Sequence, residues 1–219
     1  MDRAVDLLSS RWGRVVGPGA GAVENLGSVG LGLAGAVLAP RSVRSPVRRS
    51  AAVDTVVRVL AADLWGGAWC NNTPAAVRWY HRPERGARQR LAFCAAHLHP
   101  FVLALLDGSH GGRSTHWRRA GAEYAYLVLA AVAVEGTPAA VRPVVGVVAT
   151  AGGVVLDRAL GASPSAPWFA PVYFTKLIAG HAAGGAWPAT AGRNGQVRTV
   201  RQLDRTRSVR RDGRRPPGA

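Results

Sequence analysis

A chain of 219 residues with a net charge of +16 is long enough for one domain, or for one compact bundle with tails. Charged residues make up only 18% of it, against about 25% in soluble proteins, while 48% of its residues are apolar. The basic residues are 27 arginines and one lysine. A GC-rich genome explains this excess of arginine, so the excess is weak evidence for nucleic-acid binding. For a membrane protein, the anionic surface that attracts such a charge is the lipid headgroup layer.

The two ends of the chain differ from its centre. Residues 1–50 hold seven arginines and three acids, and residues 191–219 hold nine arginines and two acids. Because both ends have little apolar surface to bury, we expect a basic, disordered N-terminal region at 1–50 and a disordered arginine-rich tail at 189–219. The uncharged run 25–40 is open to three interpretations: a weak helix, a misplaced upstream extension or disorder.

The centre of the chain, residues 51–188, predicts a transmembrane helical domain. A spanning helix needs about 20 mostly apolar residues. Amphipathic helices of a soluble bundle place a polar residue every three or four positions, which residues 144–156 do not do. We therefore expect an all-α fold, a polytopic transmembrane bundle of about five helices in the cell membrane with disordered basic termini. The candidate helices are 51–70, 91–106, 122–134, 139–160 and 168–183.

Two histidines, His97 and His99, lie in the second candidate helix directly before Pro100. At 3.6 residues per turn they point about 200° apart on an ideal helix, so they can face one ligand only where the helix is distorted. Proline can supply that distortion and free backbone carbonyls in the preceding turn. One interpretation is a metal or proton site completed by His181 or Glu123. The spacing favours the other interpretation, in which each histidine bonds a neighbouring helix, and we expect no metal.

The first candidate helix ends in the polar stretch 63–74, Asp-Leu-Trp-Gly-Gly-Ala-Trp-Cys-Asn-Asn-Thr-Pro. Asp63 and Asn72 can share a helix face two turns apart, and Gly66 and Gly67 allow another backbone to approach closely. A buried Asp63 carboxyl can then serve as a proton donor. Alternatively, Asp63 pairs with an arginine or a histidine, and Asn72 belongs to a helix end and turn. The residues leave these interpretations open.

The fifth candidate helix carries Tyr173, Lys176 and His181. Tyr173, Lys176 and Gly180 can share one face at spacings of three and four residues. Lys176 is the single lysine of a chain that otherwise uses arginine, which indicates a specific role. It can extend to the membrane interface, or pair with an intramembrane acid such as Asp63.

Several familiar motifs are absent from the sequence. It has no nucleotide-binding glycine loop, no Gly-x-Ser-x-Gly elbow and no His-Glu-x-x-His motif. Cys70 and Cys94 belong to no Cys-x-x-Cys pair, so we expect packed thiols rather than a zinc ribbon, with a disulfide between neighbouring helices left open.

One ordered set of motifs does resemble a known group. Asp-Leu-x-Gly-Gly (63–67), Arg-Trp-Tyr-His-Arg-Pro (78–83), His-x-His-Pro-Phe (97–101) and Pro-Val-Tyr-Phe-x-Lys-Leu-x-x-x-His (171–181) look like those of small bacterial polytopic integral membrane proteins of uncharacterised function. The resemblance covers about residues 55–183. It implies a membrane fold and a polar core built from these motifs, and it implies no reaction.

The sequence supports three functional hypotheses. The first is a small membrane-embedded enzyme acting on a lipid or isoprenoid-like substrate by acid–base chemistry, as in small membrane-bound terpene cyclases, with no cofactor. Its partners would be membrane lipids and an apolar small molecule, with no specific nucleic acid. The second is a non-catalytic membrane scaffold, partner subunit or small transporter. The third is a soluble basic nucleic-acid-binding protein. For the enzyme, the expected catalytic residues are Asp63, His97, His99, Lys176 and His181, and the expected substrate-binding residues are Asn72 and Tyr173.

Overall fold

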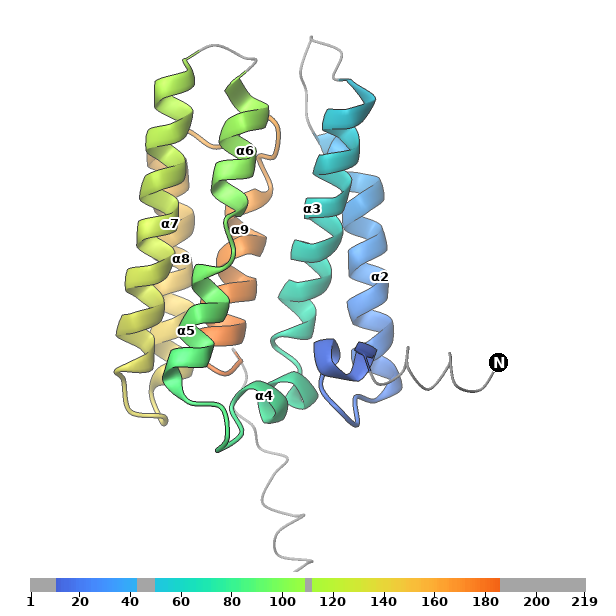
Figure 1. The fold of residues 1–219 in the computed structure, drawn as a ribbon, viewed down its shortest axis with the longest axis vertical. Coiled ribbons are helices and arrows are strands. Elements are labelled where there is room, and N and C mark those ends of the chain that lie inside the picture. Colours follow the sequence, from blue (N-terminus) through green and yellow to red (C-terminus); the bar gives the residue numbers. More distant parts are fainter. Residues whose placement is uncertain (1–10, 43–49, 109–111, 186–219) are drawn as a thin grey trace, which may run out of the picture. The chain divides into compact units, whose positions relative to one another are not determined.

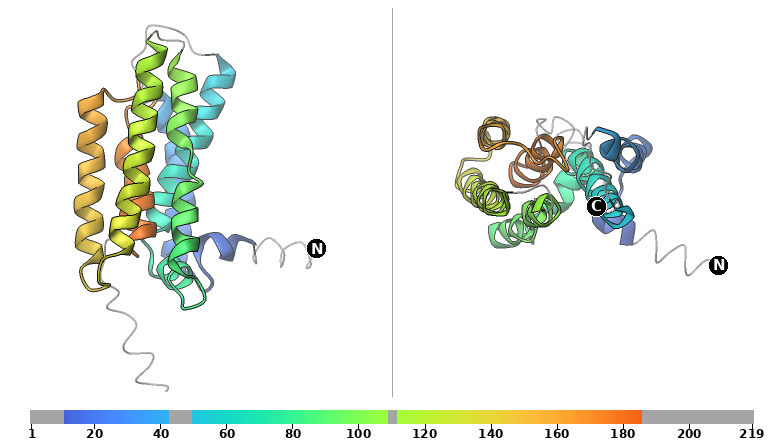
Figure 2. Two further views of the ribbon diagram at one scale, coloured as in Figure 1. Left: turned by 60° about the vertical axis from the view of Figure 1, so that its left-hand side comes forward. Right: turned by 90° about the horizontal axis from the view of Figure 1, so that it is seen from above.

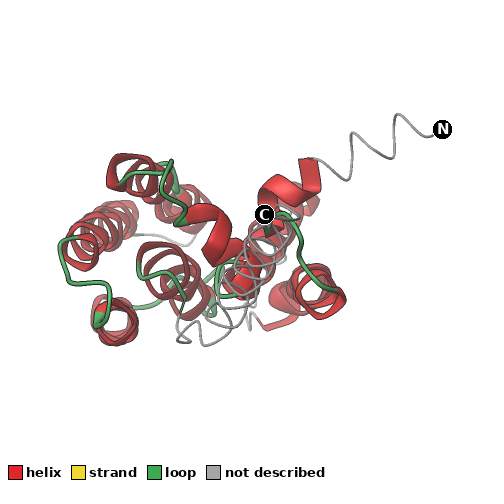
Figure 3. Cartoon of the chain, turned by 90° about the horizontal axis from the view of Figure 1, so that it is seen from below, coloured by secondary structure: helices red, strands yellow, loops and turns green. Residues whose placement is uncertain are grey.

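The computed structural model describes residues 11–42, 50–108 and 112–185, and within these ranges the chain forms helices and loops without a strand. The predicted all-α fold is thereby confirmed (Figures 1 and 3). The predicted arginine-rich tail lies outside the described residues. The helices are α2 (Ala22–Leu38), η1 (Ala39–Ser42), α3 (Ala51–Cys70), α4 (Pro74–Tyr80), α5 (Ala87–Ala95), α6 (His99–Asp107), α7 (Arg113–Glu135), α8 (Arg142–Leu160), α9 (Phe169–Phe174) and the π-helix η3 (Thr175–Ala182).

The segment formed by α9 and η3 is the core of the bundle. Its side chains are almost all buried, including Phe169, Phe174 and Leu177. The helices α5, α7 and α8 pack on one side of this segment, and α3 packs on the other, with its antiparallel partner α2 on its outer face (Figure 2). Since the last described helix is enclosed by the earlier ones, its polar groups are placed between two halves of the bundle.

The helix α2 corrects the expectation of a disordered region up to residue 50. Glycines bring it close to α3: a Cβ atom on Gly66 would lie 2.7 Å from the Ser28 carbonyl oxygen, and one on Gly35 would lie 2.7 Å from that of Ala61. Arg58 of α3 also donates a 2.8 Å hydrogen bond to the carbonyl of Ala36. Glycine lowers intrinsic helix propensity, so the sequence signal for α2 is weak, and packing against α3 stabilises the helix instead.

Three helical segments of the described residues are long and apolar enough to cross a membrane: Ala22–Arg41, Ala87–Asp107 and Arg142–Leu160. Two of them correspond to the predicted helices at 91–106 and 139–160, and the third contains the uncharged run at 25–40. The predicted number of about five spans is therefore not reached on these criteria. The helix α3 has the predicted ends but carries three charged residues.

Exposed apolar side chains cover opposite sides of this part of the chain. On α2, Val23 is 73% exposed and Leu26 is 72% exposed, and on α8, Val144 and Val155 are each 66% exposed. Apolar faces of this extent are rare on soluble monomers and are ordinary where helices meet lipid.

Candidate functional site

The predicted distortion at the two histidines is present as a break between α5 and α6. The helix ends at Ala95, and a new one begins at His99, with Pro100 in its first turn. Across this break the imidazole rings of His97 and His99 stack, with their centroids 5.3 Å apart and their planes inclined by 19°. The favoured interpretation, in which each histidine bonds a neighbouring helix, holds for His99, which bonds Asp63 of α3, and not for His97, which bonds the Phe93 carbonyl of its own helix α5.

Backbone carbonyls at the break are bonded by side chains. Nδ1 of His97 donates to the Phe93 carbonyl at 2.7 Å, the Tyr124 hydroxyl donates to the Ala95 carbonyl at 2.7 Å, and the Tyr173 hydroxyl donates to the His97 carbonyl at 2.8 Å. Unpaired backbone groups are costly in an apolar interior, so these bonds stabilise the interruption. Tyr173 thus has a role in holding the break, and it does not line the pocket described below.

The π-helix η3 is held in the same way. Its wider turn leaves carbonyls accessible, and Asn71 donates to the Lys176 carbonyl at 3.0 Å while His81 bonds the His181 carbonyl at 2.8 Å. Asn72 donates to the carbonyls of Ala68, at 2.8 Å, and Thr175, at 3.5 Å. The predicted substrate-binding role of Asn72 therefore competes with a structural one.

Asp63, His97, His99 and Lys176 come together as one group, here called the Asp63 cluster. Lys176 Nζ donates to Asp63 Oδ2 at 2.6 Å, and His99 Nε2 lies 3.1 Å from the same oxygen. Of the alternatives for Lys176, the structure shows the ion pair with Asp63. The lysine side chain is 5% exposed and the aspartate side chain is 48% exposed, so the carboxylate faces open space.

A glycine makes room for this ion pair. A Cβ atom on Gly67 would lie 2.5 Å from Cε of Lys176, which is closer than any real contact. Gly67 therefore lets the lysine stem pass along α3 towards Asp63.

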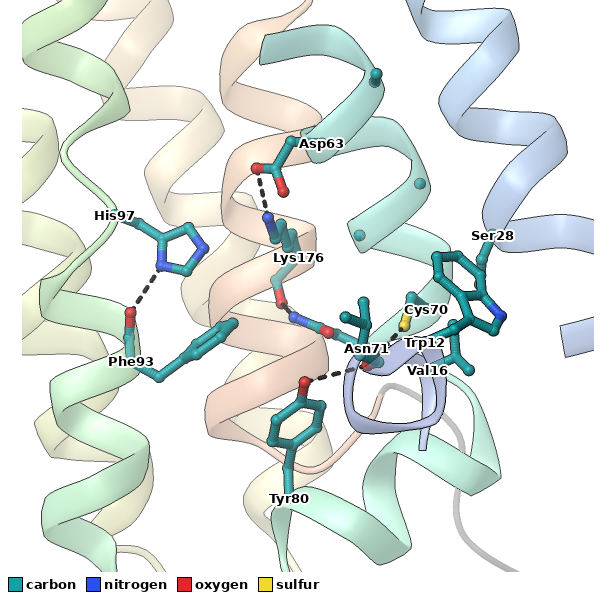
Figure 4. Close-up of a pocket in the computed structure, with 14 residues that line it drawn as sticks. Trp12, Val16, Ser28, Asp63, Cys70, Asn71, Tyr80, Phe93, His97 and Lys176 are labelled. Atoms are coloured by element: carbon teal, nitrogen blue, oxygen red, sulfur yellow. Dashed lines mark hydrogen bonds and ion pairs between the residues drawn. The ribbon is translucent and has the colours of Figure 1, made fainter. Parts of the chain in front are cut away.

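A pocket of about 350 Å³ adjoins the Asp63 cluster (Figure 4). In Figure 4 His97 lies at one end of the lining residues, Asp63 and Lys176 lie near the middle, and Trp12 and Ser28 lie at the other end. Because a carbonyl only accepts, the bond to Phe93 places the proton of His97 on Nδ1 and leaves Nε2 with a lone pair in the neutral ring. The pocket is lined by Trp12, Val15, Val16, Ser28, Ala62, Asp63, Gly66, Gly67, Cys70, Asn71, Tyr80, Phe93, His97 and Lys176.

A second pocket, of about 370 Å³, has no charged residue in its lining. Asn72 lines this pocket and not the first one. Its other lining residues are Leu31, Trp65, Ala68, Trp69, Val172 and Thr175.

His181 is not a member of the Asp63 cluster. Its ring is buried between Phe93, at a centroid distance of 4.0 Å, and Tyr80, at 5.0 Å, and neither ring nitrogen has a hydrogen-bond partner in the described part of the chain. The neighbouring His81 was not among the predicted site residues. Burial lowers the pKa of His81, which keeps its imidazole neutral while it bonds the His181 carbonyl. The Arg-Trp-Tyr-His-Arg-Pro motif was the signal that pointed to it.

Sequence reasoning also missed a second polar group, here called the closed cluster. It consists of six buried residues from α6, α7, α8 and the loop after α8. Glu123 belongs to it and lies ten residues inside α7, so the alternative in which Glu123 completes a histidine site does not hold. The members are Asp107, Arg119, Glu123, Asp157, Ser163 and Ser165.

No group of three or more histidine, cysteine, aspartate or glutamate side chains within the described ranges is arranged to hold a metal ion. Cys70 and Cys94 are both free and buried, as expected for packed thiols. The Asp63 cluster itself supplies hydrogen-bond donors and acceptors, charge and titratable groups.

Comparisons with known proteins add no further constraint: no protein-family model, no curated protein and no solved structure matches this chain.

Proposed function

We propose that this is an integral membrane protein that binds a lipid or isoprenoid-like molecule in the pocket beside the Asp63 cluster and acts on it by acid–base chemistry. The observation that carries the proposal is the composition of this pocket. Apolar side chains such as Val16 and Phe93 form much of its wall, and Asp63, Lys176 and His97 supply its polar groups. A cavity of about 350 Å³ falls within the range of sites for small ligands, about 300–1,000 Å³.

The membrane location is supported by two features of the described helices. Three segments have the length and apolar character of membrane spans, and the apolar faces of α2 and α8 are exposed on opposite sides. In such a protein a charged group away from water is costly, and it is commonly kept for a functional reason.

The geometry supports a different role for Asp63 from the proton donor considered at first. One oxygen of its carboxyl group is bonded by both Lys176 and His99, and two donors at a single oxygen favour the carboxylate. We assign to Asp63 the task of orienting His99 and holding the polar part of the ligand. Nε2 of His97, with its lone pair, is the proton acceptor.

The non-catalytic alternative, a scaffold or partner subunit, is favoured by one observation. Asn71, Asn72, Tyr124 and Tyr173 all bond backbone carbonyls of another helix or its end, so many polar side chains here join helices. The two proposals differ in what the protein retains when it is purified.

Native mass spectrometry of the detergent-purified protein, followed by lipid extraction, tests the proposal. We expect a bound apolar molecule that is lost in His97→Gln while the melting temperature stays near that of the wild type. Asp63→Asn should also lose the molecule, but with a lower melting temperature, because it leaves the buried Lys176 without its carboxylate. Ala62→Leu fills the first pocket and should displace the molecule, whereas Ala68→Leu fills the second pocket and should not. Equal ligand occupancy in all four variants, or loss of stability without loss of a ligand, would instead support the scaffold.

A further inference from the structure

The closed cluster has more acidic groups than its single arginine can neutralise. Asp107, Glu123 and Asp157 are each no more than 2% exposed, and Arg119 is 3% exposed. With all four groups ionised, the cluster would carry two uncompensated negative charges away from water. Such an arrangement is strongly unfavourable, so the partners of each carboxyl group decide which one is ionised.

Asp107 is fully satisfied as a carboxylate. Arg119 Nη2 donates to its Oδ2 at 2.6 Å, the Ser163 hydroxyl lies 2.8 Å and 3.0 Å from its two oxygens, and the backbone N–H of Ser165 donates to Oδ1 at 3.1 Å. This set of donors includes the only arginine of the cluster. Asp107 and Arg119 therefore form a neutral pair.

Glu123 and Asp157 are left with each other. No hydrogen-bond donor among the described residues reaches either oxygen of Glu123, and the nearest cationic atom is Arg119 Nε, 3.5 Å from Oε1. The Glu123 and Asp157 carboxyl groups interact across the α7–α8 interface. Two adjacent buried carboxyl groups cannot both ionise, and they behave as a single unit towards protons.

We propose that Glu123 and Asp157 form a proton-binding site between α7 and α8 that holds one proton between the two carboxyl groups at neutral pH. The ligand is the proton itself, which supplies the donor that the two carboxyl groups otherwise lack. This site is separate from the Asp63 cluster and does not depend on the function proposed for that cluster.

The other groups that act on this pair come from all the surrounding elements. Arg119 on α7 and Arg158 on α8 provide positive charge, and Asp107 on α6 adds negative charge. Tyr173 on α9 is also within electrostatic range of Glu123, but its hydroxyl donates to the His97 carbonyl. Since Arg119 is bound to Asp107 and Arg158 is exposed, neither replaces the proton between the two carboxyl groups.

Infrared spectroscopy of the full-length protein in detergent tests this site, because a protonated carboxyl group has its own carbonyl stretching band. At neutral pH we expect one such band in the wild type, shifted by deuterium exchange and lost in both Glu123→Gln and Asp157→Asn. Both amides imitate a neutral carboxyl group, so both variants should keep the wild-type melting temperature. Glu135→Gln changes a carboxylate that is paired with Arg90 and Arg142, and it should leave the band unchanged.

Two results would overturn the proposal. One is a wild-type spectrum without the band of a protonated carboxyl group at neutral pH. If sodium chloride then changes the carboxylate bands, the site binds a cation in place of the proton. The other is a band that persists in both variants. Should neither variant accumulate, an alkaline titration of the wild type decides: one protonated carboxyl band must disappear as the pH rises, and its absence throughout contradicts the site.

Discussion

The Asp63 cluster and the closed cluster each contain an ion pair between an aspartate and a basic side chain, in two different environments. In the Asp63 cluster, an ion pair of α3 and η3 lies beside a pocket, and the Asp63 side chain is 48% exposed. In the closed cluster, the Asp107–Arg119 pair is 3% exposed or less, and the Ser163 hydroxyl and the Ser165 backbone N–H complete the bonds of Asp107. The contrast shows that burial, more than residue type, separates a polar group that can meet a ligand from one that joins helices.

The largest effect is expected at Arg119, because its loss leaves buried carboxylates without a cation. We expect Arg119→Met to destabilise the protein by about 3–5 kcal/mol, the usual cost of breaking a buried ion pair. The melting temperature in detergent and the yield from membranes measure this effect. The neighbouring Arg118 is exposed, so Arg118→Met is the matched control and should change little. An Arg119→Met protein as stable as the control would mean that the closed cluster does not support the fold.

A smaller effect is expected at Gly67, where the Asp63 cluster depends on space rather than charge. The Cβ atom of Gly67→Ala would meet the Lys176 stem at 2.5 Å, so the lysine must move away from Asp63. Overpacking of this kind costs about 1–3 kcal/mol. A reduced melting temperature together with loss of the bound apolar molecule is the expected result. Gly30 has nothing within 4 Å of its Cβ position, and Gly30→Ala should leave both quantities intact.

The break between α5 and α6, which carries the histidines of the Asp63 cluster, is bonded to α7 by the Tyr124 hydroxyl. Removing this hydroxyl tests how much the bond stabilises the protein. Tyr124→Phe removes the hydroxyl that donates to the Ala95 carbonyl, at an expected cost of about 0.5–1.5 kcal/mol in unfolding free energy. Tyr126→Phe removes a similar bond to Ala149, which lies inside α8. Denaturation of both variants should show the larger loss for Tyr124→Phe, and the reverse order would show that the break needs no support from α7.

The smallest effect concerns His81, which lies outside the two clusters. Burial lowers the pKa of folded His81 below that of the unfolded chain, about 6.5. Its contribution to stability is therefore complete above that value and decreases as the pH falls towards the folded pKa, because the unfolded state then binds the proton. His81→Gln keeps a donor for the His181 carbonyl without titrating. We expect the melting temperature of the wild type to fall more than that of His81→Gln on acidification, and parallel curves would remove His81 as the cause.

The sequence alone determined much of the local structure. Pro100 lacks a backbone donor, so a distorted helix at His97 and His99 followed from chemistry that acts within a few residues. The apolar helix at residues 139–160 and the ends of α3 could likewise be predicted from residues that are neighbours in the sequence. The single lysine, Lys176, was singled out with Asp63 as one of its partners, since a buried charge needs another charge.

The tertiary structure alone decided which polar groups meet. The closed cluster joins residues 107, 119, 123, 157, 163 and 165, which no periodic pattern in the sequence connects. The helix α2 depends on glycine contacts with α3 that offset its weak helix propensity. The stacking of His97 on His99 depends on the break between α5 and α6, whose backbone carbonyls are bonded by Tyr124 and Tyr173. Helix propensity and proline geometry act along the chain, whereas burial and charge pairing depend on neighbours far away in the sequence, which only packing brings together.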